Sequence, residues 1–397
     1  MEIKNRVKQL AKEQLPTLVE TRRHIHMHPE LSFHEHETAK YIEEQLDKIG
    51  ITDRKRMANT GIVALIKGKN PDKKTFALRA DIDALPITEK NNDKPYRSQN
   101  EGVMHACGHD VHTTSLLGAS RILNELKDEF EGTVKLIFQP AEELIPGGAS
   151  ILIKEGVLKN PDVSNIVGQH VMPLIDAGKV GFRSGLYMAS TDELHVTVKG
   201  KGGHGAMPQF NIDPVLIAAH IITCLQQIVS RVAQPSVPTV LSFGKVIANG
   251  ATNVIPDEVK LEGTFRTMDE KWRAEAHTKM KKMAEGIAES MGGSVDFEIR
   301  KGYPFLMNDE NLTARTRAFA EDFLGKENVE DLDIWMAAED FAYYSQEIPA
   351  CFYRLGVRNE AKGITSSVHT PTFDIDENAL EVGAGLMAWI AISELNS

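Results

Sequence analysis

The sequence predicts an α/β fold, in which a mostly parallel sheet with helices on both faces carries an inserted α+β domain of ferredoxin-like topology. Strands and helices alternate in the first third, a βαββαβ order occupies the middle, and helix–strand–helix order returns from residue 309. The chain has 397 residues, and single cores rarely grow beyond about 250–300 residues, so we expect two domains.

The first third supplies the elements of the parallel sheet. Apolar residues recur with helical spacing in three segments, 5–25, 35–49 and 110–127. Short runs rich in β-branched and aromatic residues predict strands at 61–66, 75–79, 133–138 and 165–168. Strands separated by helices of this length favour parallel pairing, and functional sites in such sheets form at the carboxyl ends of the strands.

The middle of the chain has a different pattern. Residues 193–198 alternate in polarity with period two, which is typical of a half-buried strand. The pattern that follows predicts helices at 213–231 and 270–291, and strands at 239–247, 257–267 and 294–300. We therefore expect one domain built from residues 1–185 and 297–397, interrupted by a smaller domain at residues 186–296.

Composition excludes several classes of function. The net charge of −11 argues against broad binding to nucleic acid or anionic membranes, because phosphate contacts need a basic surface. The first ten residues lack an apolar segment, and no stretch reaches about 18 uninterrupted apolar residues, so we expect neither a secretory signal nor a membrane span. The three cysteines, Cys107, Cys224 and Cys351, indicate a reducing cytoplasm rather than a disulfide framework.

One short segment has the composition of a metal site. His105, Cys107, His109 and His112 fall within eight residues, between the strand that begins at residue 75 and the helix expected from about residue 110. The alternative is a helix start with surface histidines and a buried cysteine. The clustering of these residue types at a strand end favours metal binding.

Further candidate ligands follow other strands. Glu142 and Glu143 come after the strand at 133–138, and one of such a pair can bind a metal while the other acts as general base; the alternative is an acidic first helical turn. His170 ends another strand, and His369 lies in a loop, where a lone histidine is usually solvated. Together these segments supply five ligands, which are too many for one tetrahedral metal and suit two metals about 3.5–4 Å apart. The five are Cys107, His109, Glu143, His170 and His369.

Other polar residues suggest supporting roles. Asp81 and Asp83 face the same way and could orient a ligand histidine, unless they are simply solvated at the strand end. His204 lies in a glycine-rich loop that fits neither a P-loop nor a dinucleotide fingerprint, so we interpret it as a donor to a developing oxyanion. Arg266 could bind a substrate carboxylate bidentately, although a solvated strand-end arginine is the alternative.

These motifs resemble those of a known family across nearly the whole chain. The family comprises zinc peptidases, namely aminoacylases, hippurate hydrolases, N-acetyl-diaminopimelate deacetylases and indoleacetyl–amino acid hydrolases, and the similarity is to its amidohydrolase branch with a cysteine ligand. The motifs are Arg23-His-Ile-His-Met-His-Pro-Glu-Leu-Ser-Phe33, Leu78-Arg-Ala-Asp-Ile-Asp-Ala-Leu-Pro86, Met104-His-Ala-Cys-Gly-His-Asp110, Gln139-Pro-Ala-Glu-Glu143, Gly200-Lys-Gly-Gly-His-Gly-Ala-Met-Pro208, Asn253-Val-Ile-Pro256, Gly263-Thr-Phe-Arg266 and His369-Thr-Pro371.

The resemblance implies specific roles. The five ligands named above would hold two divalent ions, zinc or else manganese, cobalt or nickel, and Glu142 would be the general base. His204 would donate to the oxyanion, often across a dimer interface in relatives, with Asn253 and Arg266 near the substrate carboxylate. The inserted domain would be a lid and dimerisation domain, so a homodimer or higher homo-oligomer is implied. The apolar helix at 214–229 suits either a dimer surface or the lid's own core.

The expected activity is metal-dependent hydrolysis of small N-acyl amino acids, with closure of the lid during turnover. A metallo-dipeptidase or carboxypeptidase would use the same chemistry with a different acyl pocket. A non-catalytic metal-binding module is the alternative from another class. The Glu142–Glu143 pair argues against that module, because a binding role needs no base.

Overall fold

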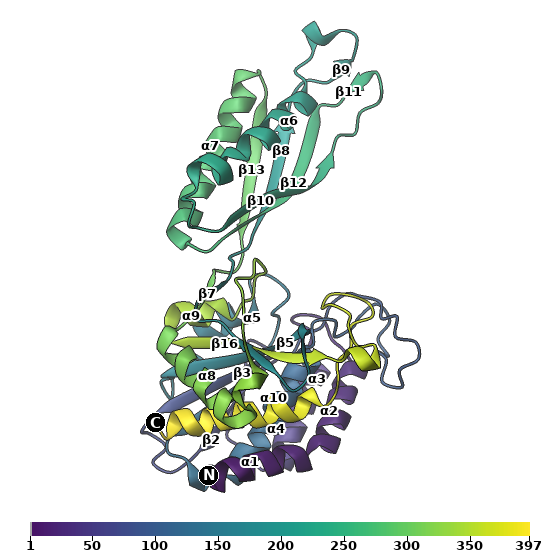
Figure 1. The fold of residues 1–397 in the computed structure, drawn as a ribbon. Coiled ribbons are helices and arrows are strands. Elements are labelled where there is room, and N and C mark those ends of the chain that lie inside the picture. Colours follow the sequence, from purple (N-terminus) through teal and green to yellow (C-terminus); the bar gives the residue numbers. More distant parts are fainter. Residues whose placement is uncertain (1) are drawn as a thin grey trace. The chain divides into compact units, whose positions relative to one another are not determined.

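The computed structural model describes residues 2–397, which divide into two compact units (Figure 1). Unit 1 comprises Met1–Tyr187, Met307–Ile334 and Asp340–Ser397, and unit 2 comprises Met188–Leu306 and Trp335–Glu339. The boundary expected at residue 296 falls inside a strand, β13 (Ser294–Lys301), and unit 2 continues beyond it to Leu306.

Unit 1 is built on an eight-stranded sheet in the order β1-β2-β4-β3-β5-β16-β6-β15. The strands β4, β3, β5 and β16 pair in parallel at the centre, whereas β1, β2 and β6 form antiparallel pairings toward the edges. The bounds are β1 Arg54–Met57, β2 Gly61–Lys67, β3 Thr75–Asp81, β4 Thr133–Gln139, β5 Asn165–Asp176, β6 Val180–Phe182, β15 Val329–Asp331 and β16 Ala350–Arg358. The mostly parallel sheet predicted from the sequence is confirmed.

Helices cover both faces of this sheet (Figure 1). Helices α4 and α10 pack against each other and on β3, while α5 and α9 contact each other and approach β4 and β16. The bounds are α1 Glu2–Glu13, α2 Leu15–Met27, α3 His36–Lys48, α4 His109–Glu125, α5 Gly148–Lys154, α8 Glu310–Leu324, α9 Ala342–Glu347 and α10 Ala379–Leu395. Short 3-10 helices occur at Lys127–Glu129, Pro208–Phe210, Lys326–Asn328 and Glu360–Lys362.

The sequence explains why these elements form the core. Every residue of β3 and of β4 is buried, as expected for central parallel strands covered on both faces. Helix α10 is apolar on all sides because it packs against α1, α4 and α8 as well as the sheet. The single helix expected at 5–25 is instead two helices, α1 and α2, and Pro16 occupies the first turn of α2, where its missing N–H is tolerated.

Unit 2 has the predicted ferredoxin-like topology. Its four antiparallel strands are ordered β10-β12-β8-β13, with two helices inserted in the βαββαβ succession. The bounds are β8 Asp192–Lys199, α6 Pro214–Leu225, β10 Thr239–Ile247, β12 Glu258–Thr267, α7 Glu270–Ser290 and β13 Ser294–Lys301. Two smaller pairings join β9 (Gly203–His204) to β11 (Val254–Ile255) and β7 (Gly185–Met188) to β14 (Leu306–Asn308).

Helix α6 and the π-helical turn Ile228–Val232 that follows it form an unusually apolar segment. By length and composition, Pro214–Val232 could cross a membrane, with a mean hydropathy of 1.6. One face of the segment packs into the core of unit 2 through Ile217, Ile221 and Leu225. The segment is therefore a core helix of unit 2 on one side and an exposed apolar surface on the other.

Candidate metal centre and catalytic site

The five predicted ligands all belong to unit 1 and come together at or beyond the carboxyl ends of its central strands. Cys107 lies just before α4 and His109 is the first residue of that helix. Glu143 follows β4, His170 lies on β5, and His369 lies in the loop before α10. Residues separated by as many as 262 positions in the chain are thus brought into one cluster.

Two overlapping groups of donor atoms make up the cluster. Cys107 Sγ lies 3.4 Å from His170 Nε2 and 3.3 Å from His369 Nε2. Glu143 Oε1 lies 3.2 Å from His369 Nε2. One group consists of Cys107, His109 and His170, and the other of Cys107, Glu143 and His369, with the donor atoms of each within 4.8 Å of one another. Cys107 belongs to both groups, and its thiolate, the imidazoles and the Glu143 carboxylate are donors that two divalent cations would accept.

The donor atoms also fit cations because two of them lack hydrogen-bond partners. Among residues 2–397, the buried atoms His109 Nε2 and Glu143 Oε1 form no hydrogen bond, although Glu143 Oε1 lies within ion-pair distance of His369 Nε2. Buried polar atoms are almost always hydrogen-bonded, so an orphaned imidazole nitrogen beside an orphaned carboxylate oxygen needs an explanation. Divalent cations held by these donor groups would satisfy both atoms.

Two of the predicted histidine ligands have one ring nitrogen directed at the cluster by a contact at the other nitrogen. His109 Nδ1 lies 3.1 Å from Asp83 Oδ1, and His170 Nδ1 lies 2.8 Å from the carbonyl oxygen of Val171. Both contacts place the ring N–H on Nδ1 and turn Nε2 toward the cluster. Asp83 also accepts hydrogen bonds from the Glu143 N–H and the Ser32 hydroxyl, at 3.0 and 2.6 Å.

Asp81 contacts a different histidine from Asp83. Its Oδ1 lies 2.5 Å from His112 Nδ1 and its Oδ2 accepts a hydrogen bond from Arg79 at 2.7 Å, whereas His109 Nε2 is 3.7 Å away. His112 Nε2 in turn accepts the N–H of Val171 at 2.9 Å. His112 therefore ties α4 to β5 beside His170, a role that its place in a histidine-rich segment did not reveal.

Burial and charge shift the protonation equilibria of the cluster. Burial raises the pKa of the Cys107 thiol well above its usual value, and the nearby Glu143 and Glu142 add to the shift. Burial, with Arg354 adding to it, lowers the pKa of His170, which favours the neutral imidazole that binds metals. Burial also tends to lower the pKa of His109, but Asp81 and Asp83 outweigh burial and raise this pKa to about 10. The cluster is thus a carboxylate-rich site, buried except at the exposed His369 and the half-buried Glu143, whose charge divalent cations would balance.

Glu142 reaches the cluster from a tightly bent loop. Its carboxylate is buried. Oε2 lies 3.9 Å from His109 Nε2, and Oε1 lies 3.4 Å from the backbone nitrogen of Asp340. The preceding residue, Ala141, is left-handed with φ +51°, and its carbonyl accepts the N–H of Gly148 at 3.0 Å. A Cβ on Gly148 would meet the Pro140 carbonyl oxygen at 1.8 Å, so the loop requires glycine there.

A buried ionic network behind α4 escaped the sequence interpretation. Arg22 Nε donates to Asp110 Oδ2 at 2.8 Å, and the same oxygen lies 2.7 Å from His26 Nδ1. All three side chains are buried. Burial would raise the pKa of Asp110, but Arg22 and His26 hold it well below its ordinary value. The network fixes the first turn of the helix that begins at His109, and the spacing of Arg22 and His26 on one helix face was its only sequence signal.

The remaining predicted residues belong to unit 2. His204 and Asn253 are brought together, because His204 pairs with Val254 and the Gly205 N–H donates to the Asn253 carbonyl at 2.8 Å. Arg266 lies near the carboxyl end of β12, where it donates to the Met336 carbonyl at 3.0 Å. Within this unit the structure therefore groups His204 with Asn253 and keeps Arg266 apart from them.

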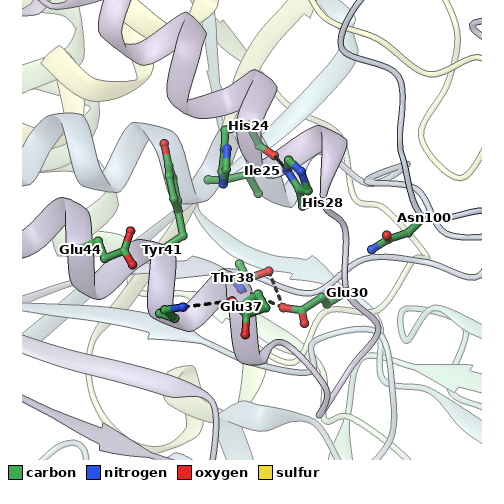
Figure 2. A pocket seen from close by; sticks show the side chains of 10 residues that line it. His24, Ile25, His28, Glu30, Glu37, Thr38, Tyr41, Glu44 and Asn100 are labelled. Atoms are coloured by element: carbon green, nitrogen blue, oxygen red, sulfur yellow. Dashed lines mark hydrogen bonds and ion pairs between the residues drawn. The ribbon is translucent and has the colours of Figure 1, made fainter.

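A separate pocket of about 470 Å³ lies between α2 and α3 of unit 1 (Figure 2). The ring of His24 stacks on Tyr41 with centroids 4.0 Å apart and lies 4.6 Å from the ring of His28. None of the predicted ligands or substrate-binding residues is among the described residues that line it. The pocket is therefore distinct from the metal centre.

Comparisons with known proteins agree with this geometry. The model of Peptidase family M20/M25/M40 matches residues 77–392. N-acetylcysteine deacetylase of Bacillus subtilis (strain 168) is 40% identical over 389 residues, which cover 96% of this chain and 97% of the relative. IAA-amino acid hydrolase ILR1-like 5 of Arabidopsis thaliana is 40% identical over 380 residues, which cover 94% of this chain and 86% of the relative.

A solved structure is similar over the same extent. The crystal structure of the Bacillus subtilis YXEP protein, described as a dinuclear metal binding peptidase from the M20 family, superposes with a TM-score of 0.83 and 37% identity. The similarity covers 97% of this chain and 99% of that chain. Given the family match over most of the sequence and relatives that align over nearly all of it, the chain belongs to the Peptidase family M20/M25/M40.

Proposed function

We propose that the protein is a metal-dependent amidohydrolase that cleaves N-acyl amino acids to a carboxylic acid and a free amino acid. The observation that carries the proposal is the convergence of five ligand-type side chains around the buried carboxylate of Glu142. Relatives named as an N-acetylcysteine deacetylase and an IAA-amino acid hydrolase support the same class of substrate.

The residues that would hold two divalent cations are Cys107, His109, Glu143, His170 and His369. Bound there, such cations would polarise the scissile carbonyl and lower the pKa of a bound water toward about 7. The thiolate and imidazoles suit zinc, while the carboxylate also admits manganese, cobalt or nickel. A ligand thiol must stay reduced, and this requirement favours a cytoplasmic location.

Glu142 would carry the proton during hydrolysis. Its carboxylate takes a proton from the attacking water and delivers it to the nitrogen of the leaving amino acid, as a general base and then a general acid. Its burial and its contact with the Asp340 N–H hold the side chain in one position, which limits the reorganisation needed in each proton transfer.

Residues of unit 2 would bind the substrate. An imidazole N–H of His204 would donate to the oxyanion that develops on the carbonyl oxygen, and Arg266 with Asn253 would bind the free carboxylate of the amino acid. Arg266 suits this role because its Nη1 donates to the Met336 carbonyl and, among residues 2–397, no carboxylate accepts a hydrogen bond from it.

The distance between His204 and Arg266 supports a homodimer. His204 lies beside Val254, before β12 begins at Glu258, and Arg266 is close to the end of that strand. A strand rises about 3.4 Å per residue, so the two side chains are separated by on the order of 25 Å. One small substrate cannot contact Arg266 and His204 of one chain, so His204, and Asn253 beside it, would come from the partner subunit.

An apolar surface on unit 2 is the place where two copies would meet. Val215 and Leu216 on α6 are 42% and 51% exposed, and β10 is an edge strand that pairs only with β12 among the described strands. Exposed apolar patches and open sheet edges are typical of subunit interfaces. The variant Leu216→Glu should shift the protein toward monomer in sedimentation velocity, and an unchanged mass would exclude α6 from the interface.

A metallo-dipeptidase is the second candidate, because the same centre would hydrolyse a peptide bond next to a free carboxylate. Release of free amine from an N-acetyl amino acid, an N-aroyl amino acid and a dipeptide with the same C-terminal residue separates the two. Faster release from the acyl compounds supports the amidohydrolase, and release from the dipeptide alone excludes it.

Arg266→Ala should lower kcat/KM more for substrates with a free carboxylate than for their carboxamides.

A further inference from the structure

One fully buried carboxylate holds two strained backbone positions. Glu35 lies between α2 and α3, and its Oε1 accepts the N–H of Phe33 at 3.0 Å and the N–H of Ala141 at 2.8 Å. Its Oε2 accepts the hydroxyl of Thr60 at 2.7 Å. Phe33 and Ala141 are both left-handed, with φ of 66° and 51°, a conformation that residues with a Cβ rarely adopt.

The position of Ala141 explains why this contact matters. Ala141 immediately precedes Glu142, so its backbone conformation sets the direction in which the Glu142 side chain leaves the loop. Its N–H is held by Glu35 and its carbonyl by Gly148, which fixes the residue from both sides. Strained backbone persists only where the surroundings determine it, and it is concentrated at functional sites.

The chemistry of Glu35 indicates a specific role for its carboxylate. The groups that donate to it are backbone amides and the Thr60 hydroxyl, all uncharged, and the side chain is 0% exposed. A buried charge without a charged partner costs free energy, and an apolar side chain would fill the same volume. The loop needs an acceptor for two converging N–H groups and a hydroxyl. A carboxylate provides two oxygens that can accept all three hydrogen bonds.

We propose that Glu35 is a positioning residue that keeps Ala141 left-handed and thereby aims Glu142 at the metal centre. The inference rests on the proposed function, since it concerns the group taken there as the proton carrier. Glu35 itself does not contact the substrate. One hydrogen bond would carry its effect to Ala141, which lies 106 positions further along the sequence.

The first test compares Glu35→Ala with Glu35→Gln in the metal-loaded protein acting on an N-acetyl amino acid. Glu35→Ala should lower kcat by about 10²-fold with KM and metal content little changed, because small misplacements of a reacting group cost about that much. Glu35→Gln should stay within about fivefold of wild type, since its amide oxygen still accepts the Ala141 N–H and Thr60 can accept from its amide N–H. Should Glu35→Ala not fold, Glu35→Asp, which withdraws the carboxylate by one methylene, carries the same expectation.

A matched control separates positioning from stability. Glu394 is likewise a buried carboxylate, but it lies at the end of α10 and accepts from Arg315 at 2.7 Å. Glu394→Ala should lower the unfolding temperature and leave kcat within about twofold. Equal losses of kcat in Glu35→Ala and Glu394→Ala would overturn the proposal.

The second test uses Ala141→Gly, because glycine adopts positive φ without a steric penalty. If Glu35 acts by holding that conformation, Glu35→Ala should cost about tenfold or less in kcat in the Ala141→Gly background, against about 10²-fold in the wild-type background. The same loss in both backgrounds would contradict the inference. An inactive wild-type protein would instead contradict the proposed function, whereas an active wild type with an unaffected Glu35→Ala variant would contradict only the role of Glu35.

Discussion

Asp83 connects two of the predicted metal ligands. Its Oδ1 lies 3.1 Å from His109 Nδ1, and its Oδ2 accepts the backbone N–H of Glu143 at 3.0 Å. Burial would raise the pKa of Asp83, but the hydrogen bond and charge of His109 lower it, so the carboxylate stays ionised beside the imidazole. One buried side chain thereby orients a ring on α4 and a loop after β4 toward the same point.

Replacing Asp83 by asparagine should weaken metal binding without unfolding the protein. The amide retains an acceptor but no longer carries the charge that orients and polarises His109, and loss of such a partner costs about 10–100-fold in metal affinity. Isothermal titration with Zn²⁺ measures the change. Asp309→Asn, which alters the N-cap of α8 instead, is the control and should leave the affinity as in wild type. Equal affinities for the wild type and Asp83→Asn would remove Asp83 from the centre.

Cys107→Ser should reduce the metal content of the purified protein. A hydroxyl is a far poorer ligand than a thiolate for zinc, and both groups of donor atoms share this residue, so both cations should be weakened. Elemental analysis after dialysis gives the metal-to-protein ratio. Cys224→Ser, in the partly exposed part of α6, serves as the matched control. An unchanged ratio in Cys107→Ser would contradict its assignment as a ligand.

Glu142→Gln should keep the metals and lose turnover. The amide fills the same space but cannot take a proton from water, and removal of a general base typically costs about 10²–10⁴-fold. Steady-state kinetics with an N-acetyl amino acid, together with the metal ratio of the same preparation, checks both statements. Near-normal kcat would exclude Glu142 as the base.

The stability of unit 2 should depend on pH through Asp192. This buried residue lies 2.6 Å from both Arg273 Nη2 and His277 Nε2. Burial would raise its pKa, but hydrogen bonds from His277 and Arg273 lower it. A lowered folded-state pKa gives stability that is present above the unfolded value of about 3.9 and is lost as pH falls through the folded value.

Asp192→Asn should therefore destabilise the protein by about 3–5 kcal/mol at pH 7, because a buried arginine loses its charged partner. The difference from wild type should begin to shrink below about pH 4, where Asp192 of the unfolded chain protonates, and should shrink further as pH falls through the lower folded-state pKa. Urea unfolding followed by tryptophan fluorescence measures it, since Trp272 is next to Arg273. A difference independent of pH would show that the charge of Asp192 does not stabilise the unit.

The sequence predicted the elements whose apolar patterns are strongly periodic. The strands at 61–66, 75–79 and 133–138 were expected within a few residues, because central parallel strands are continuous apolar runs. The break between α1 and α2 was missed because the apolar spacing continues across it. The short strands β6 and β15 were missed because three residues carry no periodicity.

In the candidate site, too, some residues could be predicted from the sequence and others could not. The ligand types were visible because cysteine, histidine and glutamate occur at strand ends in a recognisable order. The residues that orient them were not, because the contact between Glu35 and Ala141 and that between Arg22 and Asp110 join distant segments through hydrogen bonds. Such contacts depend on tertiary packing, and the local spacing of residues in one segment does not encode which distant residue is the partner.

The most direct test of the central claim is the release of free amino acid from N-acetyl amino acids by the metal-loaded protein, by the chelator-stripped protein, and by the stripped protein after Zn²⁺ or Mn²⁺ is restored. We predict release by the loaded protein, loss of at least 100-fold on stripping, which is about the smallest contribution expected of a catalytic metal, and recovery on restoration. Release that persists in protein shown to be free of metal would contradict metal-dependent hydrolysis. No release from any N-acyl amino acid by protein holding two metals would contradict the substrate class.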